Sequence, residues 1–166
     1  MRVLGINAVF HDPAAALVVD GHIVAAAEEE RFSRRKHGKR PVPYSTWELP
    51  ELAVRYCLQV AGLTADDIDV VGYSYDPSLV LPAEVLDLGD PDDAIRTRYA
   101  QRAPEAIETA FGIDRTKVRF VPHHVAHAAS AALASPEAAR EGGSSVLTVD
   151  GRGERISSLA GRYRGG

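Results

Sequence analysis

The sequence predicts an α/β fold, in which three antiparallel strands open a sheet and helices then alternate with further strands. Apolar runs at residues 2–10, 14–20 and 22–28 are separated by short turns. Asp20-Gly21, between the second and third runs, is a dipeptide typical of tight β-hairpins. After these runs, apolar residues recur at helical spacing and alternate with short apolar segments, a pattern that indicates helices packed on a sheet.

The remaining elements follow from local signals in chain order. A helix is expected at residues 49–61, beginning either at a capping box of Ser45 and Glu48 or with Pro50 in its first turn, and ending at Gly62. Its predicted core-facing stripe is Leu49, Leu52, Ala53, Tyr56, Cys57, Val60 and Leu63. Further strands are expected at 68–74, 118–122, 144–150 and 155–163, a loop at 76–93, and a helix at 92–111 that is interrupted or kinked at Pro104.

Composition excludes several classes of protein. The chain has 166 residues, of which 45% are hydrophobic and 25% charged, and its net charge is −4. No apolar run approaches the ~20 residues of a membrane span, and no signal peptide precedes the first strand. Cys57 is the only cysteine, so no intrachain disulfide is possible, and we expect it to be a small core residue. These features favour a cytoplasmic protein with no membrane and no nucleic-acid partner.

Two histidines spaced four apart form the most informative motif. His123 and His127 follow a predicted strand that ends at Pro122, and small helix-favouring residues come after them. This spacing places both imidazoles on one helix face, where they can chelate a divalent metal. The pair can equally be structural, and no glutamate follows the first histidine as it does in zinc proteases. His124 points elsewhere and is expected to pack or donate hydrogen bonds.

Two further segments have a functional and an ordinary interpretation. Asp150-Gly151-Arg152-Gly153-Glu154 is either a Gly-rich hairpin turn or a turn whose backbone approaches a phosphate closely. Six cations crowd ten residues, at Arg31, Arg34, Arg35, Lys36, Lys39 and Arg40. This run is a solvated loop, a nucleic-acid patch or an anion-binding loop for a phosphorylated small molecule. A nucleic-acid patch is disfavoured because the chain is acidic overall and few aromatic residues lie among the cations.

A strand, an acidic turn and a returning strand occur twice. The first instance contains Asp12 and the second, about 140 residues later, begins its turn at Asp150. This arrangement resembles duplicated ribonuclease-H-like domains of the actin, hexokinase and Hsp70 type, whose hairpin turns face nucleotide phosphates. We therefore expect residues 1–143 to be the first half of such a domain and 144–166 the first hairpin of a truncated second half.

These segments together resemble the nodulation-protein-U/cephamycin-type O-carbamoyltransferases. The matching motifs are Gly5-Ile6-Asn7, His11-Asp12, Asp20-Gly21, Ala26 to Arg34, Lys36-His37, Pro122 to Ser130, and Asp150 to Glu154. Ala14 departs from the serine that the family often has there. The resemblance implies that carbamoyl phosphate and ATP form carbamoyl adenylate in a YrdC-like domain, and that a Kae1-like domain of actin type transfers the carbamoyl group to a hydroxyl of a small molecule, as in antibiotic or nodulation-factor biosynthesis.

The resemblance also implies roles for individual residues. Metal ligands would be His123 and His127, holding iron(II), or else manganese or magnesium. Acid–base residues at the acceptor would be His11 and Asp12. Residues binding nucleotide or anionic oxygens would be Lys36, Arg34, Asp150, Gly151 and Gly153.

The chain is much shorter than the family, which leaves rival hypotheses open. Residues 1–166 alone are expected to be inactive as an enzyme, and the strand at 155–163 is expected to present an edge through which copies of the chain associate. An actin-type ATPase or sugar kinase would share the hairpins but does not need the histidine pair. A non-catalytic half-domain is the third possibility.

Overall fold

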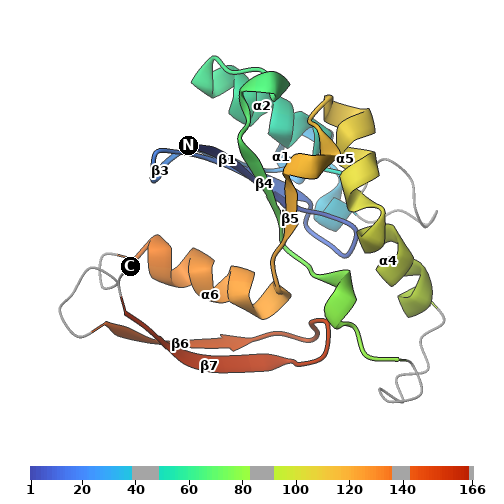
Figure 1. The fold of residues 1–166 in the computed structure, drawn as a ribbon, viewed down its shortest axis with the longest axis vertical. Helices are drawn as coiled ribbons and strands as arrows, with labels where there is room; N and C mark the ends of the chain where they lie inside the picture. The colour runs from blue at the N-terminus through green and yellow to red at the C-terminus, as the bar shows by residue number, and fades with distance from the viewer. Residues whose placement is uncertain (39–48, 83–91, 136–142, 165–166) are drawn as a thin grey trace. The chain divides into compact units, whose positions relative to one another are not determined.

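The computed structural model describes residues 1–38, 49–82, 92–135 and 143–164 (Figure 1). The chain divides into two compact units, one made of Met1–Ser74 and Asp90–Phe120, the other of Tyr75–Gly89 and Val121–Gly166. The division of the chain into half-domains at residue 143 stays a prediction.

A five-stranded mixed sheet forms the centre of the first unit. Its strands are β1 (Arg2–Asn7), β2 (Ala14–Val19), β3 (His22–Glu28), β4 (Val70–Tyr73) and β5 (Val118–Phe120), in the order β3-β2-β1-β4-β5. The first three pair antiparallel, whereas β4 and β5 run parallel to β1. The predicted α/β class and the three antiparallel opening strands are confirmed. Positive φ angles at Asp20 and Gly21 make the tight turn that joins β2 to β3.

Several strands are shorter than predicted because backbone turns interrupt the apolar runs. β1 ends at Asn7 rather than Phe10, since Val9 adopts a φ of 79°, which an extended strand does not accommodate. β5 ends at Phe120, and only Val118 of its three residues is buried. Pro122, which has no N–H to donate to a sheet, instead precedes the next helix as its N-cap residue.

The helices of the first unit are α1 (Glu30–Ser33), α2 (Glu51–Ala61), α4 (Asp92–Gln101) and α5 (Ala103–Phe111). Short 3-10 turns lie at Lys36–Gly38, Ala65–Asp67 and Arg115–Lys117. Gly62 ends α2 in the left-handed conformation, as predicted. The predicted break near Pro104 is confirmed at Arg102, which places the proline in the first turn of α5, where no N–H is needed. Ser45 and Glu48 lie outside the described residues.

No helix in the described ranges is long and apolar enough to cross a membrane.

The buried face of α2 differs from the predicted stripe. Ala53, Val54 and Cys57 are buried, whereas Leu52, Tyr56 and Val60 are between 39% and 50% exposed. The helix packs on β2 and β3, whose alanine side chains allow close approach and favour small residues at the contact. Cys57 is a core residue as predicted, and its burial raises the pKa of the thiol.

The second unit contains a helix laid along a β-hairpin. After a 3-10 turn at Pro77–Leu79 come α6 (His123–Leu133), β6 (Ser144–Val149) and β7 (Ser158–Tyr163). The two strands pair antiparallel, with Leu147 opposite Ala160, and α6 packs against both (Figure 1). β7 begins three residues later than predicted, because residues 155–157 belong to the turn.

Candidate functional site

The histidine pair stands at the start of α6, as predicted. The helix begins at His123, and His127 lies one turn further along the same face. Their Nε2 atoms are 3.1 Å apart. At this distance the two nitrogens cannot both carry a proton directed at the other. The arrangement therefore favours a third group, either a hydrogen-bond acceptor or a cation, that interacts with both nitrogens.

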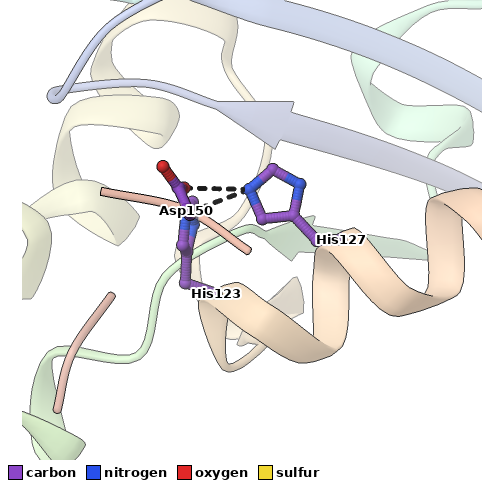
Figure 2. Close-up of side chains that lie close together, drawn as sticks. All are labelled: His123, His127 and Asp150. Carbon is purple, nitrogen blue, oxygen red and sulfur yellow. Dashed lines mark hydrogen bonds and ion pairs between the residues drawn. The ribbon is translucent and has the colours of Figure 1, made fainter. Parts of the chain in front are cut away.

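Asp150 supplies that third group (Figure 2). Its Oδ2 atom lies 2.7 Å from Nε2 of His123 and 3.2 Å from Nε2 of His127. The backbone N–H of Gly151 donates to the other oxygen, Oδ1, at 2.6 Å, which fixes the orientation of the carboxylate. The hydrogen bond from His123, helped by those from Gly151 and His127, lowers the pKa of Asp150 to about 2 against the opposing effect of partial burial.

This donor set fits a divalent cation. Three ligand atoms from His123, His127 and Asp150 converge within hydrogen-bonding distance of one another. Atoms bound about 2.0–2.1 Å from one ion lie roughly 2.8–3.4 Å apart at octahedral or tetrahedral angles, close to the spacing seen. Imidazole and carboxylate ligands suit iron(II), manganese and zinc. The sequence interpretation placed Asp150 near a nucleotide and did not include it among the metal ligands, because only the tertiary fold brings it to the pair.

His124 does not belong to the ligand set and is structural, as predicted. It is buried, and its Nε2 donates to the carbonyl of Ile156 at 2.9 Å. Its Nδ1 is 2.9 Å from the hydroxyl of Thr148. The imidazole therefore ties the first turn of α6 to strand β6, through Thr148, and to the turn that precedes β7, through Ile156.

The turn from Asp150 to Glu154 is held closely against α6. A Cβ on Gly153 would lie 2.8 Å from the His124 ring and from the carbonyl oxygen of Ile156, so only glycine fits there. The predicted close approach of the backbone is thus made to the protein's own helix. Gly151 has open space around its Cβ position. Whether these glycines also bind nucleotide stays a prediction.

A second cluster lies in the first unit and contains His11 and Asp12, the residues predicted to be catalytic. Asp12 accepts hydrogen bonds from two imidazoles, with Oδ2 2.8 Å from Nδ1 of His11 and Oδ1 2.8 Å from Nδ1 of His37. Both hydrogen bonds lower the pKa of Asp12, and the bond from His37 has the larger effect. Because a carboxylate only accepts, each Nδ1 carries a proton, and the neutral form of each ring keeps its lone pair on Nε2.

Neighbouring groups hold this cluster in an unusual backbone conformation. Asp12 and His37 adopt φ angles of 49° and 60°, which non-glycine residues rarely do. The Asp12 N–H donates to the His37 carbonyl at 3.1 Å, and the His37 N–H donates to Glu30 at 3.1 Å. Asn7 donates to the carbonyls of His11 and Asp12, both at 2.9 Å. Sequence reasoning did not assign roles to Asn7, Glu30 or His37.

The side chains of the basic run differ in their surroundings, and Arg35 is half-buried. Arg31 pairs with Glu28 and Glu30. Arg34 and Lys36 are exposed and belong to the same segment as His37, with Arg34 capping α1 in the left-handed conformation. Lys39 and Arg40 lie outside the described residues.

Known proteins are similar to this chain over much of its length. The family model of the carbamoyltransferase N-terminus matches residues 2–104. Nodulation protein NolNO of Sinorhizobium fredii is 33% identical over 156 residues, which cover 92% of this chain and 21% of that protein. An uncharacterised protein of Synechocystis sp. is 36% identical over 173 residues, covering 92% of this chain and 26% of its own length.

An uncharacterised 19.2 kDa protein of Rhizobium etli is 40% identical over 67 residues, covering 40% of this chain and 34% of that protein. The chain thus spans only about a fifth to a third of the curated relatives it matches. On the family match and the long NolNO alignment, the chain belongs to the carbamoyltransferase family and corresponds to its N-terminal part.

Proposed function

We propose that the chain is the amino-terminal part of an ATP-dependent O-carbamoyltransferase, which transfers a carbamoyl group from carbamoyl adenylate to a hydroxyl of a small-molecule acceptor. The observation that carries the proposal is the convergence of His123, His127 and Asp150 in a chain of this family. The strand order β3-β2-β1-β4-β5 supports the finer assignment of a ribonuclease-H-like half-domain.

The three converging side chains are proposed to hold a divalent metal, with iron(II) expected and manganese or magnesium as alternatives. Such an ion would act as a Lewis acid toward nucleotide phosphate oxygens. The protein's own contribution is geometric. α6 fixes the two imidazoles one turn apart, and the bond from Gly151 fixes the Asp150 carboxylate before any ligand arrives.

The cluster around Asp12 is proposed to handle the proton of the acceptor hydroxyl. With Nδ1–H of His11 bonded to Asp12, Nε2 is the basic atom that can accept this proton as the hydroxyl oxygen attacks the carbamoyl carbon, whose bond to the adenylate phosphate oxygen breaks to release AMP. The Asp12 carboxylate then stabilises the imidazolium that forms. Arg34 and Lys36 are proposed to bind anionic oxygens, and Gly151 and Gly153 to lie close to nucleotide.

Anaerobic calorimetry with iron(II), and with manganese(II) as a redox-stable probe, tests the metal site. We expect the wild type to bind one ion, and His123→Ala/His127→Ala and Asp150→Asn to bind at least tenfold more weakly. His22→Ala removes an exposed histidine outside both clusters and serves as the control. Adding AMP should raise the affinity of the wild type for manganese, since ligands that share a site are linked, and should have no such effect on the double variant. Equal metal uptake by the wild type and the double variant would refute the assignment.

A further inference from the structure

Glu154 is a buried carboxylate for which the proposed reaction has no role. Only 4% of the residue is exposed. Its Oε1 atom accepts the backbone N–H of His123 and the backbone N–H of Asp76, each at 2.8 Å. A buried carboxylate is costly unless it is well hydrogen-bonded, so a position that retains one needs an explanation.

The bond to His123 reaches the backbone of a proposed metal ligand. α6 has no side-chain cap of its own at Pro122, and the first N–H groups of a helix have no partner within it. Glu154 satisfies one of these groups, and its negative charge lies at the positive end of the helix. It thereby fixes the start of the turn from which both imidazoles project.

Glu154 also fixes the third ligand, because it closes the turn that Asp150 opens. The turn meets α6 at each of its ends, through the Asp150 carboxylate at the His123 side chain and through the Glu154 carboxylate at the His123 backbone. Between them, Gly153 packs directly against the ring of His124. If the Glu154 contact were lost, the turn could move away from α6. The carboxylate of Asp150 would then move away from the two imidazoles.

We infer that Glu154 is a positioning residue of the metal centre: it holds the Asp150–Glu154 turn on the first turn of α6 and so presets the distance between the carboxylate and the two imidazoles. The inference rests on the proposed metal site. The inference attributes this effect to the length of the side chain, which sets where its acceptor oxygen lies, and not to the negative charge.

The chain contains a matched control for ordinary helix capping. Glu29 is 6% exposed and accepts the N–H groups of Leu52 and Ala53, at 3.2 and 2.9 Å, at the start of α2. This helix also lacks a side-chain cap of its own. None of the three proposed metal ligands lies on α2, so loss of Glu29 should affect stability without affecting metal affinity.

The experiment compares cobalt(II) binding by the 166-residue chain and its variants Glu154→Gln, Glu154→Asp, Glu154→Leu and Glu29→Asp. Cobalt(II) absorption reports both affinity and coordination geometry. Glu154→Gln keeps an oxygen acceptor of the same reach without the charge, whereas Glu154→Asp keeps the charge but shortens the reach by one methylene. We expect Glu154→Gln and Glu29→Asp to stay within about threefold of the affinity of the wild type for cobalt, and Glu154→Asp and Glu154→Leu to bind about tenfold or more weakly with an altered spectrum.

Each outcome decides between explanations. If Glu154→Asp binds as the wild type does while Glu154→Gln is weakened, charge and not position matters, and the inference is wrong. It is also wrong if Glu154→Leu folds by circular dichroism and binds with wild-type affinity and spectrum. If Glu154→Leu does not fold, the cobalt affinities of Glu154→Asp and Glu154→Gln still decide between position and charge. Absence of cobalt binding by the wild type would instead overturn the proposed metal centre itself.

Discussion

At the scale of single residues, the unusual feature of this chain is that carboxylates orient imidazoles in both units. Asp150 accepts hydrogen bonds from two histidine rings through one carboxylate oxygen, and Asp12 accepts hydrogen bonds from two histidine rings through its two separate oxygens. The two arrangements have different chemical consequences. At Asp150 the ring nitrogens converge, which suits a cation, whereas at Asp12 both Nε2 atoms remain available as bases.

The lowered pKa of Asp12 predicts a specific pH dependence. Because the folded-state pKa lies below the unfolded value of about 3.8, the Asp12 contacts contribute stability that is fully present above about pH 4 and is lost as the pH falls through the folded-state pKa. Carboxyl ¹³C titration by NMR should give Asp12 a midpoint below 3.8 in the wild type. His37→Ala removes the side-chain donor that has the larger effect on this pKa, and should raise the midpoint. An unchanged midpoint in that variant would show that His37 does not bond to Asp12 in solution.

At the scale of elements, short contacts between one helix and one turn organise the second unit. α6 is positioned by its own side chains, through His124, and by Glu154 at its N-terminus. The β6–β7 hairpin therefore depends on the turn at residues 150–154 fitting closely over the helix. Glycine at position 153 makes this fit possible, since any side chain there would meet backbone as well as the ring of His124.

Gly153→Ala should consequently destabilise the second unit. The added methyl group meets the Ile156 carbonyl, which cannot rotate away, so we expect a loss of about 1–3 kcal/mol in the free energy of unfolding. Gly151→Ala is the control, because its Cβ position has nothing within 4 Å, and it should change stability by less than about 0.5 kcal/mol. Urea denaturation followed by circular dichroism measures both. Equal effects of the two substitutions would contradict the packing of the turn on His124.

At the scale of the whole molecule, the β6–β7 hairpin carries apolar side chains on the face turned away from α6. Leu147 is 70% exposed and Val149 is 77% exposed, whereas Thr148 between them is buried. No third strand joins this two-stranded sheet within the ranges that the structure describes. Exposed apolar residues on a strand of a small sheet favour pairing with another chain.

We therefore expect the 166-residue chain to self-associate in a concentration-dependent way. Leu147→Lys/Val149→Lys places charge on this face and should shift the distribution toward monomer, as measured by light scattering or sedimentation velocity. Ile23→Lys is the control, since Ile23 is 63% exposed but lies on β3, in the other unit. A wild-type chain that stays monomeric at every concentration tested would contradict the expectation, as would equal association of the wild type and the hairpin variant.

The amino-acid sequence is enough to predict the α/β class, the three antiparallel opening strands and a helix that begins near His123. These features depend on local signals, namely apolar periodicity, the Asp20-Gly21 turn and the glycine and proline residues that end elements, which act over a few residues. The same signals placed both histidines on one helix face, because four-residue spacing fixes this in any helix. They also located the interruption near Pro104, although the break itself is at Arg102.

Which residues join these histidines, and which side chains are buried, depends on the tertiary fold. Asp150 lies 27 residues from His123, and Asp12 lies 25 residues from His37, so no periodicity connects them. The exposed positions of Leu52, Tyr56 and Val60 on α2 follow from the alanine-rich strands beneath it, which sequence periodicity does not reveal. In the sequence Glu154 is recognisable only as part of the turn motif, because its hydrogen bonds go to backbone N–H groups, which carry no sequence signal. Contacts between distant segments are selected by packing and by the need to pair buried polar groups, and that is the information that folding adds.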